Sequence, residues 1–598
     1  MKTITYLTVI IIFLSVILFP QTEKTEQQKI RNKTETNFSK ILNATTTHFF
    51  DINKMRTPVI NNGVIADASI NNIRGLQYDE GTLVFSGGII LSGYKNNSFW
   101  ANAIASASRM VDYLPGVFDT INPPVNQLFK VNVNDPPFGT EWQNWINAVN
   151  LGADFYDGNK DGIYNPVDLN SNGIWDSNED RPGLIGNETT FFVYSDKLAP
   201  ALRRFTNSTP IGIEIRQTTF AFANSDYALN NVLFVKYDIL NKSGSDLDSI
   251  IFSAWADPDI GLLHSSDYVS TDTMLQTIYL YKTQSDPMYG ANPPAIFHSL
   301  MQGPVAYIPG ITFIDLNNNG VYDHGFDTPL DTAYNIRGRV LGVDTLPGAK
   351  NLGFSSSSYY MNSHMILGDP MLLNEIRFLQ LGGLTTIGGI IDPCNFSFGT
   401  VVGVNCNNIN RRFILSGDPV ANLGWINTMA ADHRTLLNIG PFNLKNNKNN
   451  VIILAYVAGR GNSPLNSVTV GKQNLTQIKE AFRRNFPVVL SAENEQDHLP
   501  QEYILHQNYP NPFSATGSSA SGGNPGTTIS WQSAVGSWQT IKLYDVLGRE
   551  IDTIVDGYYE AGKHSTFYIL NSKLPSGVYF YRLQAGNFVE TKKMILMR

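Results

Sequence analysis

The feature that most limits the fold is a succession of apolar stretches between residues 189 and 257, separated by short polar turns. Within it, Ile211, Ile213 and Ile215 recur at every second position, so they share one face of a strand. The stretches with the length of strands are residues 189–194, 211–222, 231–241 and 248–257. Because strands joined by short turns pair antiparallel, we expect antiparallel sheets packed face to face as a sandwich.

Strand patterns continue on both sides of this region, and helical patterns are rare. The other expected strands are residues 276–281, 412–416 and 451–458, with a strand pair at 82–93 that turns or bulges at its glycines. Apolar residues at helical spacing predict two helices, at 142–149 and 467–485. The expected fold class is therefore mainly β: antiparallel β-sandwich domains with few helices, and a smaller sandwich at the C-terminus.

The length of 598 residues is too great for a single hydrophobic core. Residues 1–21 have a lysine, an apolar segment and the length of a signal peptide, although no A-x-A cleavage pattern follows, and a retained N-terminal anchor is the alternative. Residues 22–48 are polar and are expected to be a disordered lead-in. The remaining expected parts are a β-rich region of two packed domains at 49–490, a linker at 491–506 and a C-terminal domain at 507–598.

Charge argues against one class of partner. Only 16% of residues are charged, the formal net charge is -8, and no run of Lys or Arg occurs. Nucleic-acid binding needs a concentrated basic surface, so the sequence predicts no nucleic-acid partner.

The strongest chemical signal lies between residues 157 and 180, where two calcium-loop patterns overlap. Alternate oxygen-bearing side chains, a glycine at position 6 and a terminal carboxylate are the requirements of a calcium loop. The first loop offers Asp157, Asn159, Asp161, the Ile163 carbonyl and Asp168. The second offers Asp168, Asn170, Asn172, the Ile174 carbonyl and Glu179.

A third, weaker copy begins at Asp315. It has Asn317, Asn319 and Asp323 in the expected places, but position 12 is Phe326, and Asp327 replaces it only if the loop is one residue longer. The predicted metal is structural Ca²⁺, and the first two loops look like the calcium-ligating segments of dockerin-like or thrombospondin-repeat proteins. The alternative for each loop is a solvated turn rich in Asn, Asp and Gly that binds no metal.

Two further pairs of residues are candidates for a chemical role, and each pair has an alternative explanation. Cys394 and Cys406 are the only cysteines, and a disulfide between them suits an exported chain, with two unpaired thiols as the alternative.

Asp257 and Asp259 stand at a strand end beside an aromatic residue, as glycosidase acids do, but a turn or another cation site is the favoured interpretation. His433 is expected to be structural.

No H-E-x-x-H, G-x-S-x-G or Walker pattern is present in the sequence. The absence of these motifs favours a non-enzymatic protein. The alternative is a secreted hydrolase of polysaccharides that uses Asp257 or Asp259.

The C-terminal segment carries a set of spaced motifs. They are N-Y-P-N-P-F at 508–513, T-I-S-W at 528–531, L-Y-D-V-L-G-R-E at 543–550, S-G-V-Y-F-Y at 576–581 and K-K-M at 592–594. On these motifs the segment resembles the type A C-terminal sorting domain of the type IX secretion system of Bacteroidetes-group bacteria. Residues 514–526 form a Ser-, Gly- and Ala-rich insertion where that family has a tighter turn.

This resemblance implies an Ig-like sandwich, recognition by the type IX secretion machinery, and a protein that is secreted or displayed on the outer-membrane surface of a Gram-negative bacterium. Residues 49–486 resemble large secreted proteins of the same bacteria that have no assigned activity. We therefore expect an exported, calcium-stabilised protein with a binding, adhesive or structural role, and a glycan or another cell-surface molecule as candidate ligand.

Overall fold

The computed structural model describes most of the chain. The described residues are 45–68, 75–79, 81–104, 112–119, 127–203, 205, 207–223, 228–362, 364–486, 502–508, 511–514, 526–535, 537–559, 562–569 and 574–597. The predicted signal peptide, most of the lead-in and most of the insertion at 514–526 lie outside them. Contacts divide the chain into two compact units, Met1–Val489 and Leu490–Arg598.

The first unit contains an eight-stranded antiparallel sheet, here called the first sheet. Its order is β1 (Thr47–Phe50), β2 (Met55–Ile60), β3 (Leu76–Tyr78), β4 (Gly81–Lys95), β13 (Leu247–Pro258), β26 (His433–Leu444) and β23 (Phe354–Met361), with β5 (Ser98–Ala103) paired to β4. Strands distant in sequence are neighbours: Trp255 of β13 lies opposite Gly88 of β4 and Leu436 of β26.

A nine-stranded antiparallel sheet, the second sheet, completes the sandwich. Its order is β14 (Tyr268–Asp272), β15 (Thr277–Tyr281), β16 (Ala295–Gln302), β27 (Asn449–Gly459), β12 (Val232–Asn241), β11 (Ile213–Ala221), β10 (Glu188–Ser195) and β6 (Leu114–Pro115), with β7 (Phe129–Asn132) paired to β10. Strands from 188 to 258 therefore supply both sheets, and the predicted antiparallel sandwich is confirmed.

The two sheets share one large core. Leu91 and Phe252 of the first sheet pack with Val235 and Tyr237 of the second, and the rings of Tyr237 and Phe252 lie 5.4 Å apart. The sequence predicted two packed domains between residues 49 and 490. The structure has one unit there, because both sheets contribute to a single continuous core rather than to two separate ones.

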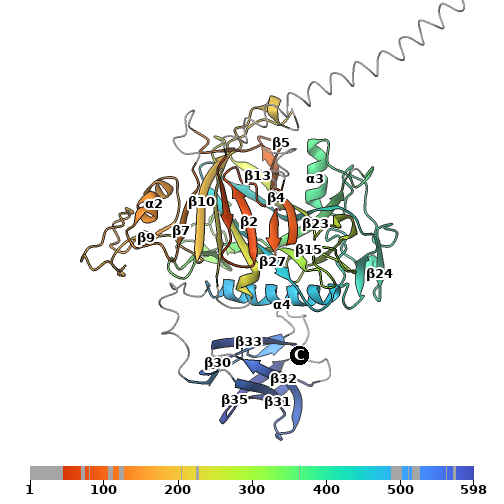
Figure 1. Cartoon of the computed structure of the whole chain (residues 1–598). Helices are drawn as coiled ribbons and strands as arrows, with labels where there is room; N and C mark the ends of the chain where they lie inside the picture. Colours follow the sequence, from red (N-terminus) through yellow and green to blue (C-terminus); the bar gives the residue numbers. More distant parts are fainter. Residues whose placement is uncertain are drawn as a thin grey trace, which may run out of the picture. The chain divides into compact units, whose positions relative to one another are not determined.

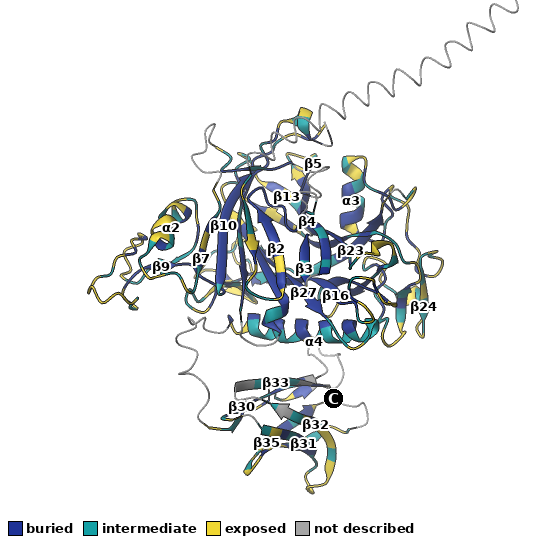
Figure 2. Ribbon diagram, viewed as in Figure 1, coloured by how far each residue is buried: buried dark blue, intermediate teal, exposed yellow. Residues whose placement is uncertain are grey.

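Helices cover the outer faces of both sheets (Figure 1). α4 (Pro464–Arg483) and α2 (Thr140–Asn150) pack on the second sheet, and α3 (Leu373–Leu381) packs on the first. This cover explains why β10 is buried along its whole length, since a sheet protected on both faces needs no polar side (Figure 2). Among the described residues, none of the helices combines the length and apolar character needed to cross a membrane.

The contact between α4 and β27 depends on glycine. A Cβ atom on Gly471 would lie 2.1 Å from the ring of Phe297, and one on Gly459 would lie 2.2 Å from the Cα atom of Gly471. Helix and strand backbones therefore meet closely at this point, and neither position has room for a side chain.

We expect Gly471→Ala to lower the free energy of unfolding by about 1–2 kcal/mol. Alanine improves helix propensity by about 1 kcal/mol, but overpacking at a closed contact costs about 1–3 kcal/mol and outweighs it. Urea unfolding measures the difference, with Gln473→Ala on the exposed side of α4 as a neutral control. Equal or greater stability in Gly471→Ala would show that the helix can move away from the sheet.

Three local predictions need correction. Residues 82–93 are not a strand pair, because β4 runs unbroken through Gly87 and Gly88, and a Cβ on Gly88 would lie 2.4 Å from the Ile104 carbonyl oxygen. Residues 412–416 form no strand, since Phe413 makes only an isolated bridge to Ser357. α3 was not predicted, because its short apolar face is interrupted by the buried, hydrogen-bonded Gln380.

Small two-stranded ladders support the loops of the first unit. They are β8 (Phe155–Tyr156) with β9 (Arg181–Pro182), β18 (Phe313–Ile314) with β19 (Thr328–Pro329), β17 (Val305–Ala306) with β22 (Lys350–Asn351), β20 (Thr332–Ile336) with β21 (Val343–Pro347), and β24 (Gly399–Val402) with β25 (Gly424–Asn427). The first two ladders flank the two insertions that contain the predicted calcium loops, so each insertion starts and ends on a paired backbone.

The second unit is a smaller sandwich. One sheet has the order β28 (Ile504–Leu505), β30 (Gly526–Ser533) and β33 (Gly562–Ile569), and the other β29 (Phe513–Ser514), β35 (Phe588–Met597), β34 (Gly577–Ala585), β31 (Ser537–Tyr544) and β32 (Glu550–Tyr559). Trp531, Ile541 and Met594 meet in its core. β28 pairs with β30, so the unit extends a few residues before the predicted boundary at 507.

Candidate functional site

The three predicted calcium loops have the same internal hydrogen-bond frame. In each, one carboxylate oxygen of the first aspartate accepts from the glycine N–H at position 6. The pairs are Asp157 with Gly162 (2.8 Å), Asp168 with Gly173 (2.7 Å) and Asp315 with Gly320 (2.7 Å). The side chains at position 5 accept from the N–H at position 7, at 2.7 Å in all three loops. The weaker third copy therefore folds like the other two.

Backbone conformation agrees among the loops as well. The residues at position 4, Lys160, Ser171 and Asn318, have φ of 62°, 59° and 57°, and the glycines at position 6 have φ of 79°, 75° and 76°. These values explain the glycine at position 6, since left-handed backbone there is strained for other residues.

A carboxylate closes each loop by accepting from the N–H groups of positions 2 and 9. Glu179 accepts from Leu169 and Asp176 at 2.7 and 2.9 Å. Asp327 accepts from Leu316 and Asp323 at 2.9 and 2.8 Å, so the third loop is one residue longer than the standard pattern.

The closing residue of the first loop differs from the predicted one. Asp180, not Asp168, accepts from Gly158 and Asn165, at 3.0 and 2.8 Å. Asp168 instead starts the second loop, where the Gly173 N–H is the main cause that lowers its pKa and keeps it ionised. The physical reason is that the chain returns at β9 and brings Asp180 back to the first loop, which sequence spacing does not reveal.

The other predicted side-chain ligands at positions 3 and 5 take part in the hydrogen bonds of the loops. Asn159, Asp161, Asn170, Asn172, Asn317 and Asn319 occupy positions 3 and 5, and their side-chain oxygens accept from loop N–H groups. Ile163 and Ile174 have side chains 66% and 65% exposed, as expected if position 7 contributes its carbonyl and not its side chain. Such an all-oxygen set suits a hard cation such as Ca²⁺.

Each loop has an aromatic residue at position 8, which anchors the first two loops by a hydrogen bond. The Tyr164 hydroxyl donates to the Trp142 carbonyl at 3.1 Å. The Trp175 Nε1–H donates to the Glu179 carbonyl at 2.9 Å, and the Arg181 guanidinium lies 4.7 Å from the Trp175 ring centroid. In the third loop the equivalent residue is Tyr322, which stacks on Tyr307.

A separate carboxylate cluster involves the predicted catalytic candidates. Oxygen atoms of Asp257, Asp259 and Asp432 lie within 4.8 Å of one another. Arg434 neutralises part of this charge: its Nε lies 3.2 Å from Asp257 and its Nη1 2.9 Å from Asp432. The sequence did not identify Asp432, although it adjoins His433 and the alternation of β26 places 432 and 434 on one face.

Burial and neighbouring negative charge raise the pKa values of two acids in this carboxylate cluster. Burial raises the pKa of Asp257 well above its usual range, although Arg434 opposes the shift. Burial, then the charge of Asp432, raises the pKa of Asp259 to about 6. His433 lies outside the cluster, 5.0 Å from the Tyr359 ring, and burial lowers its pKa to about 4, so it is neutral and structural.

We expect Arg434→Met to cost about 3–5 kcal/mol of unfolding free energy at pH 7, because it leaves buried carboxylates without their cation. Chemical denaturation measures it, and Arg483→Met, which breaks an exposed pair with Glu480, is expected to cost below about 1 kcal/mol. A cost as small as that of the control would mean that the carboxylates do not depend on the guanidinium.

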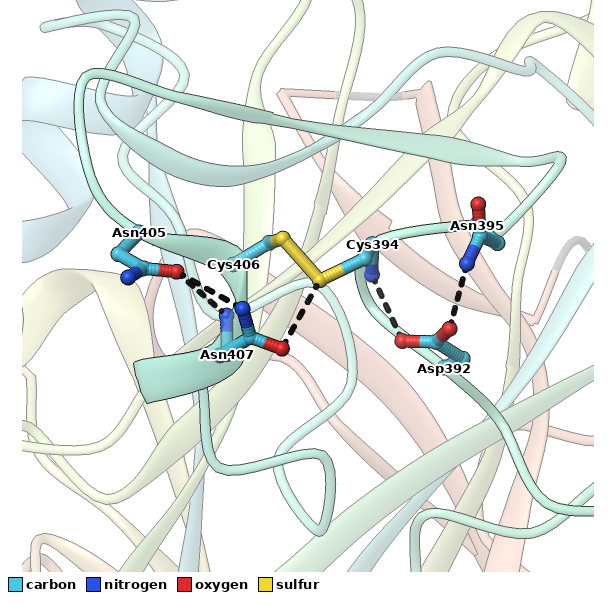
Figure 3. The surroundings of a disulfide bond; sticks show 6 residues. All are labelled: Asp392, Cys394, Asn395, Asn405, Cys406 and Asn407. Carbon is cyan, nitrogen blue, oxygen red and sulfur yellow. Dashed lines mark hydrogen bonds between the residues drawn. A yellow bond between two sulfur atoms is a disulfide. The ribbon is translucent and has the colours of Figure 1, made fainter.

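Cys394 and Cys406 are joined in a disulfide (Figure 3). The bond closes a short loop before η4 (Cys406–Asn408), and side chains on both sides brace it. Asp392 accepts from the Cys394 N–H at 3.0 Å, and Asn405 accepts from the Asn407 N–H at 3.0 Å. These hydrogen bonds hold the backbone on both sides of the disulfide.

In the second unit the sequence motifs supply a joint between its sheets and hydrogen bonds within one of them. The Asn508 N–H donates to the Tyr581 hydroxyl, which in turn donates to the His506 carbonyl, both at 2.7 Å. Asn511 accepts from the Ile595 N–H at 2.8 Å. Asp545 accepts from Arg549 Nε at 2.7 Å and closes the turn of the D-V-L-G-R motif.

Solved structures give no support for an activity. A polysaccharide lyase aligns with 64% of this chain and 34% of its own, at 6% identity and a TM-score of 0.17. The trimeric ectodomain of the C. elegans fusion protein EFF-1 aligns with 62% of this chain and 75% of its own, at 10% identity and a TM-score of 0.15. This chain spans about a third of the lyase's length, and scores this low carry no argument. No curated protein sequence matches the chain.

One family comparison is decisive for a part of the chain. Residues 508–597 match the family described as secretion system C-terminal sorting domain. The matched range lies within the second compact unit and includes the motifs at its joints. Residues 508–597 therefore form the C-terminal sorting domain of a protein exported by type IX secretion.

Proposed function

We propose that the first unit is a calcium-stabilised binding protein that acts outside the cell, as a secreted or surface-displayed adhesin and not as an enzyme. The observation that supports it most directly is the common frame of the three loops, each closed by a carboxylate: Asp180, Glu179 and Asp327. The external medium supplies the millimolar calcium that loops of extracellular modules bind.

The placement of the loops supports a stabilising role for the metal. Each insertion leaves and rejoins the unit through a ladder of only two short strands, β8–β9 or β18–β19. Such short ladders are weak alone. Calcium that binds only the folded loops adds stability to them without any catalytic step.

The direct test is calcium stoichiometry. Calorimetric titration of the metal-free full chain is expected to show about three sites per chain, with affinities in the range of extracellular modules. Asp157→Asn, Asp168→Asn and Asp315→Asn should each remove one site. Lys160→Ala, at a loop position whose side chain supplies no ligand, is the control. No heat of binding in the parent chain would reject the calcium part of the proposal.

A secreted polysaccharide hydrolase is the second candidate, and the carboxylate cluster favours it. Asp259, with a pKa raised to about 6, has the property of a general acid, and Asp257 and Asp432 are beside it. A screen of polymeric glycans should then show hydrolysis that Asp259→Asn lowers by about 100-fold or more. Asp238→Asn, a carboxylate remote from the cluster, is the control, and equal rates in both variants would exclude Asp259.

A further inference from the structure

A cleft of about 1130 Å³ opens in the first unit beside the third calcium loop. One wall is that loop, through Tyr322 and His324, and another is formed by Tyr307 after β17 and by the end of β21. Asn443 near the end of β26 and Lys448 in the connection from β26 to β27 also line it. Neither the calcium loops nor the carboxylate cluster accounts for this space.

Two stacked tyrosines form an aromatic platform in the cleft. The rings of Tyr307 and Tyr322 lie 5.7 Å apart with an interplanar angle of 19°, and Tyr307 is 45% exposed. Tyr322 is fixed from its other sides: the edge of Phe313 contacts it at 5.4 Å, and a Cβ on Gly348 would lie 2.5 Å from its ring. The platform is therefore rigid before any ligand arrives.

Comparison with the other loops shows what is unusual about Tyr322. Tyr164 and Trp175, at the same loop position, each donate a hydrogen bond to the protein. The Tyr322 hydroxyl makes no hydrogen bond to any described residue, and its ring lines an open space. The third loop thus presents to the cleft a residue that the first two loops use as an anchor.

Polar groups surround the platform at the cleft wall. The Asn443 side-chain oxygen accepts from the Ser249 N–H at 3.0 Å, which leaves its NH₂ group available. Deeper in the cleft, Gln302 accepts from the Ile336 N–H at 2.9 Å and donates to Asn335 at 3.2 Å, so these amides are held in fixed orientations. Within the described residues, the side chains of Lys448 and His324 make no hydrogen bonds, and both are exposed.

We propose that this cleft binds a carbohydrate chain, with one sugar ring stacked on Tyr307. A sugar ring has an apolar C–H face that matches an aromatic surface, and hydroxyl groups at its rim that match amide, lysine and imidazole donors. The cleft has the volume of a small-molecule site and accommodates several sugar units. The inference rests on the proposed binding role and names its ligand class and its site.

The test is calorimetric titration of the full secreted chain with cello-, manno-, xylo- and polygalacturonate hexasaccharides, in calcium. At least one should bind with a dissociation constant below about 1 mM. Tyr307→Ala should weaken that binding by about 10-fold or more, as the loss of a central aromatic contact does. Tyr334→Ala is the matched control, because Tyr334 is 50% exposed and lies outside the cleft lining.

The outcomes test the carbohydrate-binding role of the cleft and the calcium proposal independently of each other. Binding that is equally strong in Tyr307→Ala, or absent for every hexasaccharide, overturns the cleft assignment even if calcium binds. Tyr307 is exposed, so its variant is expected to fold, and unchanged melting confirms that a loss is local. Glycan binding by a chain that takes up no calcium would keep the cleft assignment and reject the calcium role.

Discussion

A chain that lacks residues 502–598 will remain inside the cell envelope, and its amount in the medium and on the surface will fall to background. The first unit has its own core, formed entirely by residues before 490, so the shortened chain still has what it needs to fold. What it loses is the sorting domain at 508–597. Immunoblots of medium, outer membrane and periplasm measure the distribution.

Two controls make the export experiment specific. Deletion of residues 515–525, which interrupt the sorting domain between β29 and β30, should leave export intact, as expected for a tolerated insertion. Trp531→Ala should impair export strongly, because this core residue is 1% exposed and its loss costs about 3–5 kcal/mol in a small sandwich. Normal secretion of the truncated chain would show that the first unit carries its own export signal.

The sandwich was predictable because its strands obey local rules. Ile213 and Ile215 are both fully buried, and β10, β11, β12 and β13 begin and end within a few residues of the predicted positions. The alternation of apolar and polar residues, together with short turns, indicates which residues of a strand face a core. These patterns do not indicate which strands pair with each other. The sequence therefore did not predict that β4, β13 and β26 are neighbours in one sheet.

One of the local errors came from glycine. In the sequence, Gly87 and Gly88 have the same appearance as a turn, yet they lie inside the continuous strand β4, where the Ile104 backbone approaches. Local sequence patterns do not distinguish a glycine that permits a turn from one that permits a close contact, because the difference depends on a distant chain segment.

In the candidate sites, too, contacts between residues that are distant in the sequence were not predictable. The turn geometry of positions 1 to 7 in each predicted calcium loop was predictable, since these positions lie within a short stretch of chain. Asp180 was not, because it reaches the first loop only through the β8–β9 ladder. Asp432 was missed for a similar reason: β13 and β26 are far apart in sequence but adjacent in the first sheet.

Calcium removal is expected to lower the melting temperature of the first unit by about 10 °C. In about 10 mM calcium, a site with a dissociation constant of about 0.1 mM is saturated about 100-fold and contributes about 2.7 kcal/mol, so three such sites contribute about 8 kcal/mol. A unit of this size loses roughly 1–2 °C per kcal/mol, by extrapolation from smaller domains. Scanning calorimetry with calcium and then with chelator measures the shift, and Mg²⁺ should restore little of it, because it requires a smaller octahedral site.

A local signal should precede the global transition. Trp175 is held by the Glu179 carbonyl and by Arg181, so chelation that loosens the second loop should expose its ring and shift its fluorescence to the red. Trp175→Phe should remove that shift, while Asp168→Asn should produce it even in calcium. An unchanged melting temperature and unchanged fluorescence in chelator would together mean that the hydrogen bonds of Asp180, Glu179 and Asp327 hold the loops without metal.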